Sequence, residues 1–272
     1  MKRVRMMVAA MATSALLLPF ASDATAEAAI RPSGTDRNPP QPAAPSAPSA
    51  PGQNVVDALA AAAAAGNVDA MNDLGVLYSL GVQVPPDYPM ALYWYQRAID
   101  RGSVEAMNNL ATMYLFGVGL SRDYVNAFHW FQRAAEGGNP HGMYSVAVMA
   151  DMGLGTARDP ALGRAMYRKA AEAGFTPAMV RISDDYARGP TGSHDLVEAY
   201  AWLEVALQAG VPEELQIEVL SRIDALGTRL GAARRDEARV RAVRLAALVK
   251  AHVLPAKTES AKPVEPVRSN LM

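Results

Sequence analysis

Apolar and small residues recur along this chain with a spacing that predicts pairs of helices. Ala70, Leu74 and Tyr78 are separated by four residues each time, which places them on one side of a helix with 3.6 residues per turn. Gly81 ends this predicted helix, because glycine adopts the left-handed conformation that closes helices. A short loop follows, and Asp87 then begins a second amphipathic helix. The pattern therefore predicts a helical hairpin.

The same pattern returns every 36 residues through four units, without insertion or deletion. One glycine closes each unit, at Gly102, Gly138, Gly174 and Gly210. One aspartate precedes each second helix, where its carboxylate can cap free amide groups: Asp87, Asp123, Asp159 and Asp195. A period of this length indicates stacked units that bury their apolar faces against one another. The sequence thus predicts an all-α solenoid of about four 36-residue helix-pair repeats, with capping helices at both ends.

The predicted repeats divide the chain into segments. A half-repeat at 54–66 matches the second helix of a unit and covers one end, and the full repeats span 67–102, 103–138, 139–174 and 175–210. Residues 211–253 have a helical pattern that is out of phase, with Gly227 and Gly231 marking a break, and we expect them to cap the other end. Residues 27–53 are rich in Pro and Ala and predict a disordered linker, and 254–272 predict a disordered tail.

The N-terminus has the pattern of a secretory signal peptide. Lys2, Arg3 and Arg5 precede an almost uncharged apolar run at 6–20, and small residues at Ala24 and Ala26 suit a cleavage site. The apolar run is shorter than the roughly 20 residues that a transmembrane helix needs. We therefore predict a cleaved signal at 1–26, a periplasmic protein and no stable membrane insertion after cleavage. The alternative is an uncleaved anchor in the inner membrane, with the rest facing the periplasm.

Charge and motifs argue against several classes of function. Cleavage after Ala26 removes three of 26 basic and one of 27 acidic side chains, leaving 23 against 26, so a nucleic-acid partner is not expected. The four histidines lack a second ligand at helical spacing, so no metal is expected. The chain has no cysteine and none of the common serine-nucleophile or phosphate-binding motifs. We predict that it is not an enzyme and needs no cofactor.

The second unit carries a resemblance to a known family. It reads Ala106-Met107-x-x-Leu110-x-x-x-Tyr114-x-x-Gly117-x-Gly119, then Asp123-x-x-x-Ala127-x-x-Trp130-Phe131-x-x-Ala134-Ala135-x-x-Gly138. This pattern closely resembles the Sel-one-like repeat (SLR), a relative of the tetratricopeptide repeat. The resemblance implies a right-handed α/α superhelix with an inner groove. In such proteins the first helix of each repeat lines the groove, which holds a protein or peptide.

The resemblance also implies which residues face a partner. They are first-helix positions that remain once the core face is assigned: Asn72, Asp73, Val76, Asn108, Asn109, Thr112, Tyr144, Ser145, Arg181 and Asp184. Asn72, Asn108 and Asn109 could bond a peptide backbone, because a carboxamide both donates and accepts. We expect a periplasmic interaction scaffold or adaptor that regulates a sensor kinase or envelope assembly. The alternative is a protein that binds or hydrolyses peptidoglycan fragments or β-lactams.

Overall fold

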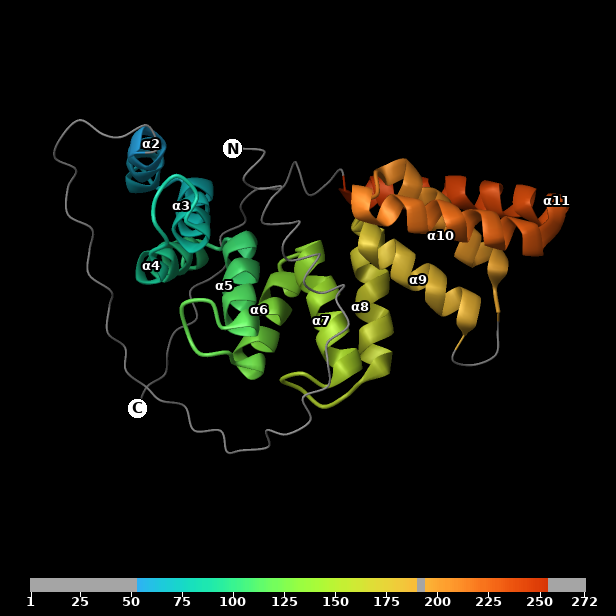
Figure 1. The fold of residues 1–272 in the computed structure, drawn as a ribbon, viewed down its shortest axis with the longest axis horizontal. Coiled ribbons are helices and arrows are strands. Elements are labelled where there is room, and N and C mark those ends of the chain that lie inside the picture. The colour runs from blue at the N-terminus through green and yellow to red at the C-terminus, as the bar shows by residue number, and fades with distance from the viewer. Residues whose placement is uncertain (1–52, 190–193, 254–272) are drawn as a thin grey trace. The chain divides into compact units, whose positions relative to one another are not determined.

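The computed structural model describes residues 53–189 and 194–253, and these residues form ten helices and no strand (Figure 1). The prediction of an all-α chain built from helix pairs is confirmed. The predicted signal peptide, nearly all of the linker, and the tail lie outside the described residues. Within the described residues, no helix is both long and apolar enough to cross a membrane.

Contacts between helices divide the chain into two compact units, Met1–Arg122 and Asp123–Met272. The described helices of unit 1 are α2 (Gln53–Ala64), α3 (Val68–Leu80), α4 (Tyr88–Ile99) and α5 (Val104–Phe116). Those of unit 2 are α6 (Tyr124–Glu136), α7 (Pro140–Met152), α8 (Pro160–Glu172), α9 (Thr176–Arg188), α10 (Leu196–Ala209) and α11 (Glu213–Val253). Within each unit, every helix packs against the next one along the chain.

The four repeated aspartates cap the second helix of each pair, as predicted. The carboxylate of Asp87 accepts the amide hydrogen of Met90 at 3.0 Å, and that of Asp195 accepts the amide hydrogens of Val197 and Glu198. Asp123 and Asp159 make equivalent bonds at the starts of α6 and α8. Because these carboxylates satisfy amide groups that a helix leaves unpaired, they serve the fold rather than catalysis.

A small residue in the first helix of a pair allows the second helix to approach closely. A Cβ atom added to Gly75 of α3 would lie 2.5 Å from the ring of Tyr95 on α4. The equivalent residue of α9 is Ser183, which is almost fully buried and donates its hydroxyl hydrogen to the carbonyl oxygen of Ala199 on α10 at 2.8 Å. In the first and fourth repeats, the period therefore places a small side chain where the two helices of the pair cross.

The loop inside a pair also packs against the preceding repeat. A Cβ atom on Gly155, in the loop between α7 and α8, would lie 2.0 Å from the carbonyl oxygen of Tyr124 at the start of α6. Gly155 has a φ of 67° and Gly119, one period earlier, has a φ of 72°. In the first repeat the same position is Gln83, which keeps a positive φ of 71° although it has a side chain. Gln83 thus adopts a left-handed conformation that is unfavourable for residues other than glycine.

The last helix consists of two helical segments. Gly231 has a φ of 72° and a ψ of 175°, so α11 is interrupted there, while Gly227, also expected at the break, lies within the helix and is buried. Val219, Leu226 and Leu230 are buried on the first segment, and Ala242 and Leu245 on the second. Both segments therefore have one buried face, and α10 and α11 share an extensive contact.

The left-handed backbone at residue 83 predicts a stabilising substitution. Replacing Gln83→Gly should raise the free energy of unfolding by about 0.5–1 kcal/mol, because glycine adopts this conformation without steric conflict. Gln83→Ala keeps a Cβ atom and should give no such gain. Urea denaturation of the three proteins measures the difference, and equal midpoints for Gln83→Gly and wild type would contradict the assignment.

Candidate functional site

In unit 1, the residues predicted to line a groove are mainly used in helix packing. Asn72, Asp73, Val76 and Asn108 are buried, while Asn109 and Thr112 are partly exposed. The side-chain amide of Asn109 donates to the side-chain oxygen of Asn72 at 2.9 Å, which joins α5 to α3. The hydroxyl of Thr112 donates to the backbone oxygen of Asn108 at 2.9 Å. Their contact with a partner stays a prediction.

In unit 2, the predicted groove residue Tyr144 belongs to an aromatic cluster. Tyr144 is 5% exposed, and its ring centre lies 5.4 Å from that of Tyr167 and 5.2 Å from that of Phe175. The ring of His141 lies 4.5 Å from that of Phe175. Ser145 beside Tyr144 is buried. This cluster packs the first turns of α7 against α8 and the start of α9.

The other two predicted residues, Arg181 and Asp184, line an open cleft of about 360 Å³. We call it the arginine–aspartate cleft. It is formed by the end of α7, the start of α8 and the exposed face of α9, and its charged lining residues are Asp151, Arg158, Arg164, Arg181, Asp184, Asp185 and Arg188. The structure thus brings Arg181 and Asp184 together with five further charged residues.

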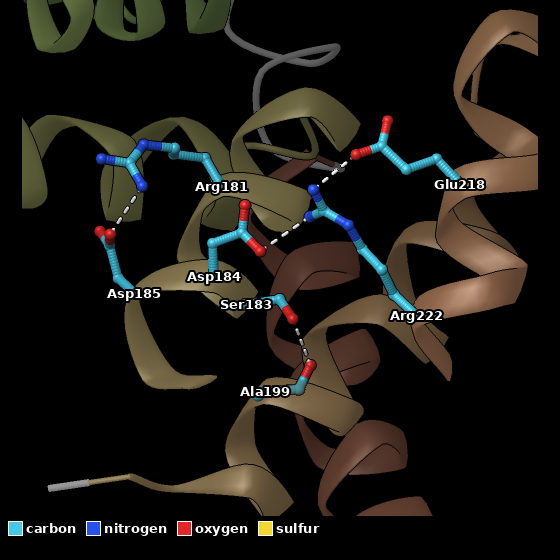
Figure 2. Close-up of polar contacts among 7 residues, drawn as sticks. All are labelled: Arg181, Ser183, Asp184, Asp185, Ala199, Glu218 and Arg222. Atoms are coloured by element: carbon cyan, nitrogen blue, oxygen red, sulfur yellow. Dashed lines mark hydrogen bonds and ion pairs between the residues drawn. The ribbon is translucent and has the colours of Figure 1, made fainter. Parts of the chain in front are cut away.

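A network of ion pairs holds the face of α9 that lines this cleft (Figure 2). Arg181 pairs with Asp185 on the next turn at 2.8 Å and with Asp151 of α7 at 3.4 Å. Its guanidinium also lies 5.2 Å from the ring centre of Tyr167. Asp184 pairs with Arg222 of α11 at 2.8 Å, and Arg222 also pairs with Glu218. Contacts with α7 and α11 therefore fix Arg181 and Asp184 of α9.

Three arginines of the cleft are not neutralised in this way. Arg158, Arg164 and Arg188 form no ion pair with a carboxylate of residues 53–189 or 194–253. Arg158 instead donates from Nε to the backbone oxygen of Asp151 at 2.9 Å, which orients its guanidinium without neutralising the charge. The cleft therefore presents fixed carboxylates that are already paired and arginines that are available to an anion.

The repeat itself shows that these charges are unusual. Arg164 replaces Leu92, Phe128 and Tyr200 of the other repeats, and Arg188 replaces Leu80, Phe116 and Met152. Asp185 stands where the other repeats have Leu77, Met113 and Met149. Comparing the repeats position by position could have identified these residues in the sequence. Each of these residues is a charged side chain at a position of the 36-residue repeat that is apolar in the other repeats.

A local change in packing makes room for one of the carboxylates. Gly163 on α8 takes the place of Ala91, Ala127 and Ala199 in the other repeats. A Cβ atom on Gly163 would lie 2.4 Å from the side-chain oxygen Oδ1 of Asp151. The small residue therefore lets Asp151 approach α8, so that the carboxylate and the glycine form a matched pair in the third repeat.

Burial disfavours the charged form of the Asp185 side chain, and the neighbouring Arg181 favours it. Loss of hydration on burial raises the pKa of the Asp185 carboxyl above its ordinary value, although Arg181 acts in the opposite direction. The side chain is 23% exposed. A partly buried carboxylate at a position that suits methionine should therefore lower the stability of the fold.

Known repeat families and solved structures share the architecture of this chain. The stacked helix pairs are those of an α-solenoid repeat protein. The Sel1 repeat matches four consecutive segments, at residues 68–103, 104–139, 140–175 and 176–211. Together these segments make up more than half of the chain. The chain therefore belongs to the Sel1 repeat family, as its resemblance predicted. Proteins built of these repeats are generally interaction scaffolds and typically not enzymes.

Solved structures show the same fold. A Sel1 repeat protein from Oxalobacter formigenes is 22% identical, with a TM-score of 0.59 over 71% of this chain and 79% of that chain. A protective antigen with an SLR fold, present in uropathogenic Escherichia coli strains, is 23% identical, with a TM-score of 0.50 over 74% of this chain and 51% of that chain. No curated protein sequence gives a significant match.

Side chains that could bind a metal ion are not clustered in the part of the chain that the structure describes. No cluster of three or more His, Cys, Asp or Glu side chains with a suitable arrangement occurs within residues 53–189 and 194–253. The carboxylates of the arginine–aspartate cleft are paired with arginines, and this arrangement favours recognition of an anionic group over binding of a cation.

The cost of the buried carboxylate can be measured. Asp185→Met restores the side chain that the second and third repeats have at this phase, and it should raise the free energy of unfolding by about 1 kcal/mol. Asp185→Asn keeps the size and polarity and should gain much less. Thermal unfolding at pH 7 compares the two variants with wild type. An Asp185→Met protein that melts below wild type would contradict the argument.

The aromatic cluster predicts a dependence of stability on pH. Burial lowers the pKa of His141 below its ordinary value, so the unfolded chain takes up a proton at a higher pH than the folded chain. The contribution of neutral His141 is therefore complete above about pH 6.5, the pKa of the unfolded chain, and declines as the pH falls through the folded value.

Replacing His141→Phe should remove this part of the acid sensitivity, while replacing the exposed His129→Phe should not. Urea midpoints at pH 7.5 and pH 5 provide the measurement. An unchanged difference between the two pH values in His141→Phe would show that other groups are responsible.

Proposed function

We propose that this chain is a periplasmic interaction scaffold that binds a protein or peptide at the arginine–aspartate cleft. The observation that carries this proposal is the set of charges at Asp151, Arg164, Asp185 and Arg188, which occupy phases that are mainly apolar in the other repeats. The family supplies the general role of a scaffold, and the departures from its pattern identify the surface. The signal sequence at 1–26 supports the periplasmic location.

The chemistry of the cleft favours a partner that presents carboxylates. Arginine forms paired, charge-assisted hydrogen bonds with carboxylates, and these are stronger than bonds between neutral groups. Arg164 and Arg188 lie at the cleft without a carboxylate partner among the described residues, while Arg181 is held in place by two aspartates. An acidic side chain or a C-terminal carboxylate of a partner protein fits this arrangement.

The cost to stability supports a binding role. A partly buried carboxylate whose pKa is raised by burial is unfavourable for folding, and a charged position of this kind is typical of sites where binding needs the charge. An arrangement that served only to stack the repeats would place methionine or leucine there, as the other three repeats do. We therefore assign the charges to recognition of a partner protein, through which the scaffold regulates a sensor kinase or envelope assembly.

Charge reversal at the cleft tests the proposal. A photo-crosslinking residue in place of the exposed Ala161, at the start of α8, should capture partner proteins from a periplasmic extract. Adding Arg164→Glu and Arg188→Glu should reduce the yield of specific crosslinks about tenfold or more, because each lost pair contributes about 1.5 kcal/mol or more. Mass spectrometry identifies and quantifies the partners.

The matched control is Arg229→Glu, which reverses an exposed arginine of α11 outside the cleft. It should leave the crosslinks unchanged. Unchanged crosslinks in the double variant, with native helix content, would overturn the assignment of the cleft. Covalent labelling of the purified chain by a fluorescent penicillin would instead favour the alternative, a protein that acts on β-lactams or peptidoglycan fragments.

A further inference from the structure

A second and larger cleft, of about 830 Å³, lies between the first turn of α10 and the segment of α11 that follows Gly231. We call it the terminal cleft. Its main lining residues are Glu198, Arg234, Glu237, Val240, Arg241 and Arg244. None of these residues lines the arginine–aspartate cleft, and the repeat pattern does not extend to α11. The volume is in the range of sites that bind ligands in proteins.

One wall of the terminal cleft is rigid and its carboxylates are already used. Asp195 accepts the amide hydrogens of Val197 and Glu198 at 3.1 and 3.0 Å. Glu198 is 8% exposed and accepts two hydrogen bonds from Arg241, at 2.6 Å from Nε and 3.2 Å from Nη2. This two-point pair fixes the rotation of α11 against α10.

The other wall presents arginines without partners. At 100° per residue, the side chains from Arg234 to Arg244 that line the cleft lie within about a third of the circumference of α11. Arg234 and Arg244 are exposed and form no ion pair with a carboxylate of the described chain. They are ten residues apart, which corresponds to about 15 Å along a helix.

The surface between these two arginines is acidic and then apolar. Glu237 lies one turn after Arg234, and Val240, one turn before Arg244, has 56% of its surface exposed. A ligand that follows α11 thus meets the cation Arg234, an anion, an apolar side chain, and then the cation Arg244 beside Arg241, whose charge is paired with Glu198. Four residues of an extended chain cover about 13 Å, and alternate side chains point the same way, so positions one, three and five can face α11 together.

We propose that the terminal cleft binds an extended acidic segment of a partner protein, with carboxylates four residues apart on Arg234 and Arg244 and a small apolar side chain between them on Val240. The positions between are uncharged, since Glu237 repels a further carboxylate. This site is separate from the arginine–aspartate cleft and does not depend on the proposed function of that cleft.

The alternation of charge favours a peptide over an anionic membrane surface. A lipid surface attracts a face that is cationic throughout. Here Glu237 lies between the two free arginines, and Asp236 is 75% exposed on the same turn. A peptide can place its carboxylates at both ends and avoid the acidic position, whereas a uniformly anionic surface cannot.

Binding of a labelled peptide tests the proposal. A fluorescent peptide that contains Glu-Ser-Val-Ser-Glu should raise its anisotropy when it is titrated with the purified chain. A peptide with both glutamates replaced by glutamine, and one with the two glutamates adjacent, should bind at least about tenfold more weakly. Added sodium chloride should weaken binding of the first peptide, because exposed ion pairs are screened.

Variants of the protein locate the site. Arg234→Gln and Arg244→Gln should each weaken the peptide about tenfold, and neither removes a contact seen within the described chain. Arg229→Gln, an exposed arginine on the same helix before Gly231, is the matched control and should bind as wild type. Arg164→Gln with Arg188→Gln should also leave peptide binding intact, which separates this result from that of the arginine–aspartate cleft.

Two outcomes would overturn the proposal. One is equal binding of the peptide by wild type and by the Arg234→Gln and Arg244→Gln double variant, with both proteins folded by circular dichroism. The other is binding to vesicles that contain phosphatidylglycerol, lost in the double variant, with no binding of the peptide. The second outcome would assign the cleft to an anionic membrane surface.

Discussion

The close approach of the two helices of a pair, in the first, third and fourth repeats, is the contact on which the rest of each unit depends. It requires a small residue at one position of these repeats, filled by Gly75, Ala147 and Ser183. A Cβ atom on Gly75 would collide with the ring of Tyr95, and the hydroxyl of Ser183 is only tolerated because it donates to the backbone of α10. Where this approach is kept, side chains at the other positions of the repeat meet similar neighbours.

That regularity explains why a few charges change the character of one region. In the third and fourth repeats, Asp151, Arg164 and Asp185 occupy phases that elsewhere hold mainly apolar side chains, and Gly163 provides the space that Asp151 needs. The charges cannot all be satisfied from within α9, so Asp184 pairs with Arg222 of α11 (Figure 2). The cleft is therefore supported by residues from the repeats and from the helix that follows them.

Most of the fold could be predicted because its determinants are local. The N-caps at Asp87 and Asp195 depend on bonds to amides two or three residues away, and the glycine that ends each first helix acts on its own helix. These features recur at every period and are visible without any knowledge of tertiary contacts. The break at Gly231 was also predictable, because that residue stands between two amphipathic segments.

The site was less predictable because its contacts join residues far apart in the chain. Glu198 and Arg241 are 43 residues apart and Asp184 and Arg222 are 38 apart, and in each pair one member lies outside the periodic region. Asn72 and Asn109 were expected to face a partner, yet they bond each other between successive first helices. How far such positions open to solvent depends on the angle at which helices stack, and the period alone does not determine that angle.

The two ion pairs that hold α11 also bear on how the stack ends. A solenoid has an apolar face at each end, and an uncovered end can accept another copy of the same surface. Arg222 holds the first segment of α11 on α9, and Arg241 holds the second segment on α10, on either side of Gly231. Because the two ion pairs attach different segments of α11, the loss of one leaves the other in place. The cover of the last repeat is thereby held at two separate points of α11.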